Sequence, residues 1–468
     1  MKKTIAALVS ALALAAACKE PLSAPSEDAL VAGSAQPVQN LVTGVLAQDR
    51  SASGAFSLLL YPEGLARNAL RPDPNEPRFV SELIAVPSDP SAFIGSSGWN
   101  GYFTTIRAVN QLIASKSVTS LAAGDQNAVK GLVQTVKAIS YLRLVQLRDT
   151  LGVPIQTDQT AAPDPLRTKT SVLAYVSALL DSGYTNLTAA GVSAAVPVKM
   201  PAGYTIKGDF SSTANLAKFN RGLKGETEVY RLLDHQSPCA ACAASAITAL
   251  STALAGVPQT AAGLAFGPYF EYNPLAPESF ATPIADNRIY VTDNWVNSIQ
   301  AGDARASKAF KAATPSVQNG GLATSLQYKS PLTDPTVQTR PIPIRRAAFW
   351  YLLRAQAEAE SGALAAALAD VNVVHTVEGG IAPLGAFAAA TDARAAILYE
   401  TRYSMLFEGP YYLTALREYS ALTRAYVSQP GMPQQKSDPN HLSDPLTSTL
   451  PIPQNESVAR NGDVTPKP

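Results

Sequence analysis

One stretch, residues 99–155, decides the fold of this chain; it reads WNGYFTTIRAVNQLIASKSVTSLAAGDQNAVKGLVQTVKAISYLRLVQLRDTLGVPI. Its first part has apolar residues at steps of three and four, the spacing of one face of an α-helix. Its second part has a broader apolar face, with lysines and arginines on or near the other side. The first face comprises Trp99, Tyr102, Phe103, Ile106, Val109 and Ile113, and the second Val129, Leu132, Val133, Val136, Ile139, Leu144 and Leu147.

The segment between the two faces carries turn residues, Ala122-Ala123-Gly124-Asp125. Because so short a link returns the chain at once, we expect the two helices to pack antiparallel as a hairpin. The run Leu151-Gly152-Val153-Pro154 ends the second helix.

This hairpin resembles the opening unit of the SusD/RagB-like outer-membrane lipoproteins. The resemblance rests on Trp99-x-x-Tyr102, Ala108-x-Asn110, Lys137-Ala138-x-x-Tyr141-x-x-Leu144-Val145 and Gly152-Val153-Pro154. It implies a mostly α, tetratricopeptide-like fold and a protein that captures a nutrient, usually a glycan, for a SusC-like TonB-dependent transporter. It also implies an outer-membrane location facing the cell surface.

Later motifs extend the resemblance over almost the whole chain after its leader. They are Gly302-Asp303-Ala304-Arg305, Arg345-x-Ala347, Glu358-Ala359, Asp370-Val371-Asn372, Glu400-x-Arg402, Glu408-Gly409 and Leu450-Pro451-Ile452-Pro453. Tyr411 and Thr414 depart from it, since the family usually has Arg and Asp there. We expect the paired arginines Arg345 and Arg346, and the Glu400/Arg402 signature, to form ion pairs that hold helices together.

The periodicity predicts about four helical hairpins, each burying its face against a neighbour. Their expected ranges are 99–155, 171–255, 345–377 and 391–427, with Ser171 as a helix N-cap. Between them, residues 256–343 lose helical periodicity and form a variable insert, with one short helix over Asn294–Ile299. The SusD-like domain would span 40–468 and begin with a helix at 41–48, followed by irregular, proline-rich segments.

The first seventeen residues are typical of a secretory leader, with Lys2-Lys3 before an apolar run too short to span a membrane. Leu14-Ala15-Ala16-Ala17-Cys18 resembles a bacterial lipobox, which makes Cys18 the lipidated N-terminus and the membrane anchor. The alternative is an ordinary Ala-x-Ala cleavage that leaves Cys18 free. Residues 18–39 would then form a flexible tether.

Charge and cysteine content narrow the classes further. The chain has 37 basic and 36 acidic residues, so it has no basic excess to neutralise phosphates and we expect no nucleic-acid partner. Cys239 and Cys242 are spaced Cys-x-x-Cys; in an exported chain this favours a local disulfide over a metal site or a redox centre. For a metal, only His235 is a near further ligand.

No catalytic motif is present: the sequence has no Gly-rich phosphate loop, no His-Glu-x-x-His and no Gly-x-Ser-x-Gly. His235, His375 and His441 are far apart along the chain. We therefore expect a binding protein without cofactor or metal. A pair of glycosidase carboxylates stays open, because their separation is a property of the fold.

The candidate ligand-binding residues are the rings and amides of the insert. Rings on loops commonly stack on the apolar face of a sugar, and side-chain amides can bond its hydroxyls. The alternative is that these rings pack the insert onto the helices. A carbohydrate or peptide ligand fits this set, and the rival function is a helical scaffold that binds protein partners and no small ligand. The residues are Tyr269, Tyr272, Tyr290, Asn294 and Trp295.

Overall fold

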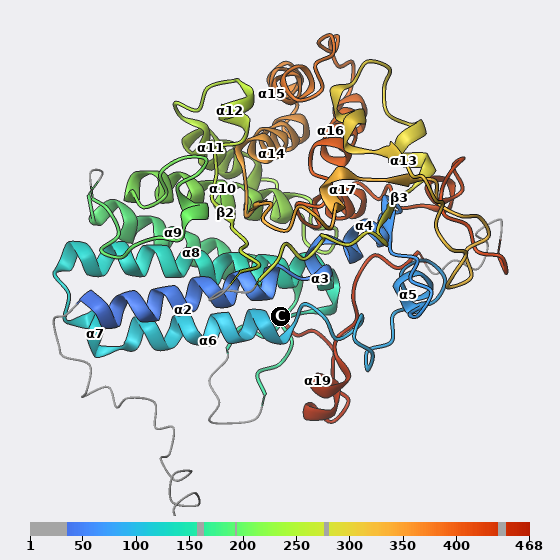
Figure 1. The fold of residues 1–468 in the computed structure, drawn as a ribbon. Helices are drawn as coiled ribbons and strands as arrows, with labels where there is room; N and C mark the ends of the chain where they lie inside the picture. The colour runs from blue at the N-terminus through green and yellow to red at the C-terminus, as the bar shows by residue number, and fades with distance from the viewer. Residues whose placement is uncertain (1–34, 157–162, 192–193, 276–279, 439–445) are drawn as a thin grey trace, which may run out of the picture.

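The computed structural model describes residues 35–156, 163–191, 194–275, 280–438 and 446–468; Cys18, most of the expected tether and His441 lie outside them. One side of the molecule is a layer of three long helices lying side by side (Figure 1): α2 (Ala35–Ser53), α6 (Asn100–Ala114) and α8 (Ala123–Arg148). The predicted hairpin of α6 and α8 is confirmed. A short helix, α7 (Lys116–Thr119), capped by the Ser115 hydroxyl, lies in the link.

The N-terminal helix is longer than the sequence indicated. Helix α2 begins at Ala35, inside the expected tether, and runs past the predicted segment 41–48. The cause is a buried apolar face that starts early: Val38 and Val42 are almost fully buried, as are Val45 and Leu46. Residues 35–39 are therefore part of the folded unit.

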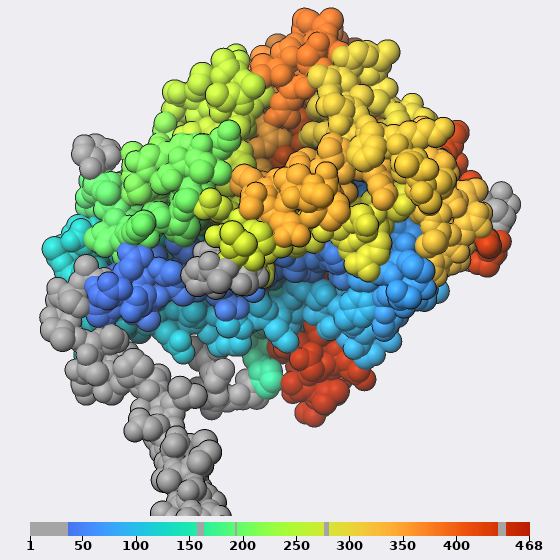
Figure 2. Space-filling view, in the orientation of Figure 1, coloured from blue at the N-terminus to red at the C-terminus, as the bar shows by residue number. Residues whose placement is uncertain are grey.

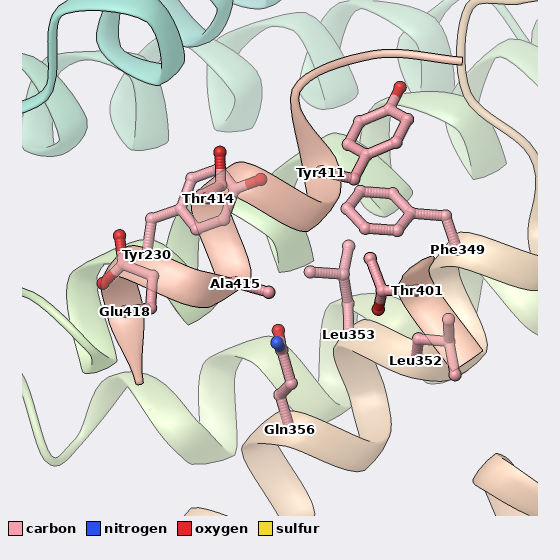
Figure 3. Close-up of a pocket in the computed structure, with 10 residues that line it drawn as sticks. All are labelled: Tyr230, Phe349, Leu352, Leu353, Gln356, Thr401, Tyr411, Thr414, Ala415 and Glu418. Carbon is pink, nitrogen blue, oxygen red and sulfur yellow. The ribbon is translucent and has the colours of Figure 1, made fainter. Parts of the chain in front are cut away.

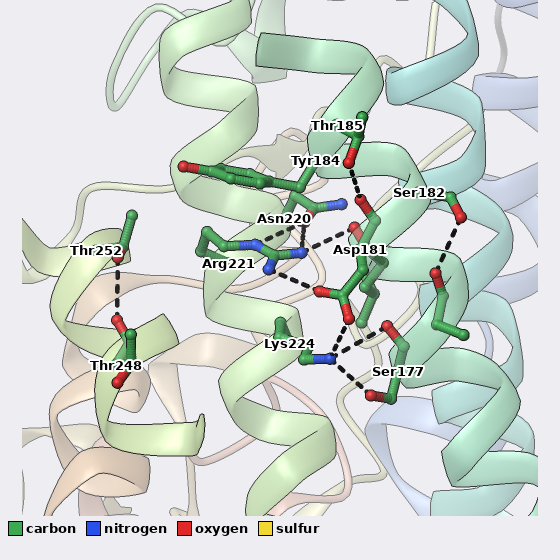
Figure 4. Close-up of polar contacts among 12 residues, drawn as sticks. Ser177, Asp181, Ser182, Tyr184, Thr185, Asn220, Arg221, Lys224, Thr248 and Thr252 are labelled. Carbon is green, nitrogen blue, oxygen red and sulfur yellow. Dashed lines mark hydrogen bonds and ion pairs between the residues drawn. The ribbon is translucent and has the colours of Figure 1, made fainter. Parts of the chain in front are cut away.

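The next helices are α9 (Lys169–Ala189), α10 (Thr213–Leu232) and α11 (Cys242–Leu254). The N-cap of α9 is Thr168 and not Ser171, because the Thr168 hydroxyl accepts the Ser171 N–H at 3.3 Å. Figure 4 shows how polar side chains join α9 to α10: the Asp181 carboxylate pairs with Arg221 at 2.9 Å and with Lys224 at 2.6 Å.

Two further pairs complete the helical part: α14 (Ala347–Glu360) with α15 (Leu364–Val377), and α16 (Ala390–Ser404) with α17 (Tyr411–Glu418). Helix α11 packs on α14, and α14 packs on both α15 and α16, so the pairs stack as an array. Buried alanines such as Ala355 let these helices approach closely. The mostly α, tetratricopeptide-like architecture follows from this stacking.

The insert contains more regular structure than expected. Four two-residue strands form an antiparallel sheet in the order β1-β3-β5-β4, and β2 pairs with β6. Strand β1 comes from the segment before α6, so the sheet ties the insert to the N-terminal part of the chain. The strands are β1 (Ala69–Leu70), β2 (Tyr269–Phe270), β3 (Tyr290–Val291), β4 (Phe310–Lys311), β5 (Tyr328–Lys329) and β6 (Ile342–Pro343).

The remaining elements are short. The α-helices are α3 (Phe56–Leu59), α4 (Tyr61–Leu65), α5 (Arg78–Ile84), α12 (Ala261–Leu264), α13 (Asp293–Asn297), α18 (Arg424–Val427) and α19 (Gln454–Ala459). The 3-10 turns are η2 (Asp149–Leu151), η3 (Ala202–Tyr204), η4 (Ala304–Lys308) and η5 (Pro331–Thr333). In the part of the chain that the structure describes, no helix combines the length and the apolar character needed to cross a membrane.

Buried ion pairs hold the helices together, as predicted for the paired arginines. Arg345 donates to Glu226 of α10 at 2.7 Å, and both side chains are at most 1% exposed. Glu400 pairs with Arg305, and its other oxygen is in hydrogen-bond contact with His375. Glu400 and Arg402 do not pair with each other, because residues two apart on a helix face different directions.

Candidate functional site

The structure places Trp295 in the core and not on a ligand surface. Its side chain is 0% exposed, and its ring centroid lies 4.9 Å from that of Tyr403 on α16. The Tyr403 hydroxyl donates to the Trp295 carbonyl at 3.1 Å, which fixes α13 against α16. The expectation of a sugar-stacking ring is wrong for Trp295 in this structure, because no face of it reaches the surface.

Three other predicted residues also hold the insert in place. Tyr272 is 2% exposed and stacks on Phe280, and Tyr290 packs under the Lys329 ammonium and donates to the Thr314 carbonyl. Asn294 accepts from Arg402 and donates to the Pro430 carbonyl, both at 2.8 Å. These contacts occupy the rings and the side-chain amide that would have to be free to bind a ligand. The alternative interpretation, packing of the insert onto the helices, holds for Asn294, which contacts Arg402 of α16, and for Tyr272, whose hydroxyl lies close to Gly54 at the end of α2. The contacts of Tyr290 lie within the insert itself.

Tyr269 is different, because it lines a cleft of about 660 Å³. The cleft lies between α12, the turn η4, the segment 340–343 and the end of α15, and Figure 2 shows the surface hollowed there, between the yellow-green, yellow and orange parts of the chain. A volume of this size suits a small ligand. The cleft is therefore the candidate site.

The cleft walls mix apolar and charged side chains. The lining residues are Ala261, Ala265, Tyr269, Ile284, Ala304, Arg305, Ser307, Lys308, Leu332, Arg340, Pro341, Ile342, Pro343, Arg346, Val377, Glu378, Leu406, Phe407 and Glu408.

Arg346 organises one wall of the cleft. Its guanidinium donates to both oxygens of Glu408, at 2.7 and 3.0 Å, and also pairs with Glu378. Burial alone would raise the pKa of Glu378, but the Arg346 guanidinium holds that pKa below its usual value. Glu378 is thus held in its ionised form, and both carboxylates are already bonded to Arg346.

The turn η4 supplies two more cations. Arg305 donates to Asp303 at 2.6 Å and also pairs with Glu400, whose other oxygen lies 2.6 Å from His375 Nδ1. Lys308 donates to the carbonyls of Tyr403 and Ser404, and burial lowers its pKa. The site therefore presents fixed charges and hydrogen-bonding groups over apolar walls, an arrangement suited to binding.

The departures Tyr411 and Thr414 line a separate, very small cavity (Figure 3). Its volume of about 10 Å³ holds one water molecule at most. Tyr411 stacks on Phe349 with ring centroids 4.1 Å apart, and its ring also lies 4.8 Å from the Arg345 guanidinium. Tyr411 is therefore held by aromatic packing and by a cation–π contact.

The remaining predicted groups do not line the cleft. Cys239 and Cys242 form a disulfide at the start of α11, and nearby His235 contacts the Arg417 carbonyl. His375 is buried against Glu400. Among the described residues, no group of three or more His, Cys, Asp or Glu side chains is placed to hold a metal ion.

The cleft could not be found from the sequence, because its walls come from at least five separated segments of the chain: 261–269, 304–308, 340–346, 377–378 and 406–408. Arg346 was expected only as a structural ion-pair partner, and Lys308 and Arg340 carried no motif at all. A signal did exist at Glu408-Gly409, which comes directly after Phe407, a residue in a left-handed backbone conformation with φ of 60°. That turn places Phe407 and Glu408 in the cleft wall.

No protein-family model and no curated protein matches this sequence. Solved structures do match the fold. A SusD superfamily protein from Parabacteroides distasonis gives a TM-score of 0.64 at 13% identity, over 90% of this chain and 98% of that one. A SusD-like carbohydrate binding protein from Bacteroides fragilis gives 0.65 at 13%, over 90% and 98%. A SusD homolog from Bacteroides thetaiotaomicron gives 0.62 at 15%, over 92% and 97%.

Proposed function

We propose that this chain, which has the fold of the SusD superfamily, captures a saccharide in the cleft between α12, η4 and the segment 340–343. The observation that carries the proposal is the cleft itself. It is large enough for a small oligosaccharide, it has apolar walls for sugar faces, and it has fixed polar groups for hydroxyls. Similarity to proteins described as carbohydrate-binding supports the ligand class.

We propose that the cleft binds the saccharide and does not hydrolyse it. A glycosidase needs one carboxyl group that holds a proton at working pH. In the cleft, the pKa of Glu378 is lowered, which disfavours the protonated form of this carboxyl, and both oxygens of Glu408 are occupied as acceptors by Arg346.

The test narrows the cleft with one bulky side chain. Ala261 and Ala262 are adjacent, exposed residues of α12, but only Ala261 lines the cleft. Ala261→Trp should weaken the binding of oligosaccharides measured by calorimetry, while Ala262→Trp should leave it unchanged. Equal saccharide affinities in the two variants would show that the saccharide binds outside this cleft. A wild-type protein that binds no saccharide would contradict the proposed function.

The proposal includes an anchor and a partner. Lipidation of Cys18 would hold the folded unit at the outer membrane, facing the cell surface, through residues 19–34. The partner would be a SusC-like TonB-dependent transporter that receives the ligand. We expect Cys18→Ala to move the protein from washed membranes to the soluble fraction, and we expect wild type to co-purify with such a transporter encoded beside it.

Protein that still sediments with membranes after Cys18→Ala would refute the lipid anchor. A scaffold that binds only protein partners remains the rival function. It would co-purify with proteins as well, but it would bind no saccharide, and Ala261→Trp would have no effect on its interactions.

A further inference from the structure

Two cations that line the cleft, Arg340 and Lys308, form no ion pair within the described parts of the chain, and Lys308 donates instead to two carbonyls. Arg346 is matched by Glu378 and Glu408, and Arg305 by Asp303 and Glu400. No carboxylate of the described chain forms an ion pair with Arg340, although that residue lines the same cleft.

The guanidinium of Arg340 is held in place without being satisfied. Its Nη2 donates to the Pro331 carbonyl at 2.7 Å, which fixes the orientation of the group. Its Nε is buried and has no acceptor in the described parts of the chain. One buried donor of the half-buried Arg340 side chain is thus left without an acceptor, and an anionic ligand group in the cleft would supply one.

The nearby charges do not cancel Arg340. Asp334 interacts electrostatically with Arg340, but it forms no ion pair with that residue. Its carboxylate accepts the N–H and the hydroxyl of Thr336. Lys308 lies near Arg340 because both contact the segment 330–331. The Ser330 hydroxyl donates to the Lys308 carbonyl at 2.7 Å, and the Pro331 carbonyl accepts from Arg340. The single guanidinium of Arg346 faces two carboxylates, those of Glu378 and Glu408. The Lys308 ammonium interacts electrostatically with both and offsets the second negative charge.

We propose that Arg340 anchors one anionic group of the ligand, so that the cleft selects acidic saccharides, carrying a carboxylate or a sulfate, over neutral ones. The inference rests on the proposed function and names its substrate class. A planar guanidinium with a fixed orientation matches the geometry of a carboxylate or a sulfate, and such charge-assisted bonds are among the stronger ones.

The test uses pairs of saccharides that differ only in charge. The probes are trigalacturonate with its methyl ester, a hyaluronan tetrasaccharide with its carboxyl-reduced form, and a sulfated galactose disaccharide with its desulfated form. In at least one pair, wild type should bind the acidic member about tenfold tighter at low salt, and the preference should shrink as salt rises. The carboxylate and sulfate pairs show which anion is preferred.

Arg340→Gln should abolish the preference by lowering the affinity for the acidic member to that for the neutral member, and Arg340→Lys should keep part of the preference. Lys311→Gln is the matched control, because Lys311 is an exposed cation on β4 outside the cleft. Melting temperatures check that each variant folds. An equal affinity for both members of every pair, or a preference that survives Arg340→Gln, would overturn the inference and leave saccharide capture standing. Failure of every probe, charged or neutral, would remove both.

Discussion

Replacing Trp295 by alanine tests whether the aromatic residues of the insert are core or ligand surface. The indole is fully buried, packs on Tyr403, and belongs to a five-residue helix that the Thr292 hydroxyl caps. Truncation of a buried tryptophan removes these contacts and leaves a cavity, which costs about 3–5 kcal/mol. Within the described parts of the chain the indole N–H has no hydrogen-bond partner, so the expected cost comes from lost packing.

That cost converts to a shift in melting temperature. Unfolding entropy is about 2.1 cal/mol/K per residue near 60 °C. For 468 residues this gives an entropy of about 1 kcal/mol/K. Trp295→Ala should therefore lower the melting temperature by about 3–5 °C in a calorimetric scan.

The control is Phe310→Ala, which removes another ring of the insert that is 50% exposed on β4. Its free energy of unfolding should change by no more than about 0.5 kcal/mol. Saccharide affinity should survive Trp295→Ala at temperatures where the variant is folded. Lost affinity with an unchanged melting temperature would contradict the burial of this ring and return Trp295 to the ligand site.

Three further predictions concern stability. Burial and the nearby Asp370 raise the pKa of Glu358 to about 7. Between about pH 4.5 and 7 the native state therefore binds more protons than the unfolded state. The free energy of unfolding falls as the pH rises through that range. Glu358→Gln should therefore be more stable than wild type at pH 8, by about 1–3 kcal/mol in urea unfolding, and equal to it at pH 4. Arg345→Ala should lower the free energy of unfolding by about 3–5 kcal/mol, since it leaves the buried Glu226 carboxylate without its cation. A decrease as small as that for an exposed arginine would refute the role of this pair. Reduction of the disulfide at the start of α11 should lower stability by at most a few kcal/mol and leave saccharide binding intact, because the loop it closes is short; complete loss of binding would indicate a redox role.

The helices were predictable because their signal is local. Apolar residues three and four apart, such as Ile106 and Val109, mark one face within a few turns, and both are buried where the pattern placed them. The start of α2 was missed because the alanine, serine and proline content before it is typical of a tether. Only the packing of Val38 and Val42 against other helices shows that the segment is folded.

The site was not predictable in the same way. An aromatic residue on a short helix of a loop-rich insert has the same sequence signature whether it faces solvent or core. Trp295 is core because of Tyr403, which lies 108 residues later in the chain. The cleft likewise depends on Tyr269, Arg340 and Glu408 meeting in space, and no local pattern joins such distant residues.

The most direct test of saccharide capture is a crystal structure of the protein with the saccharide that binds it tightest. We predict that density for the sugar lies in the cleft between α12, η4 and the segment 340–343, in contact with Tyr269 and with an anionic group against Arg340. Density for the sugar at any other surface, with this cleft filled only by solvent, would contradict the account.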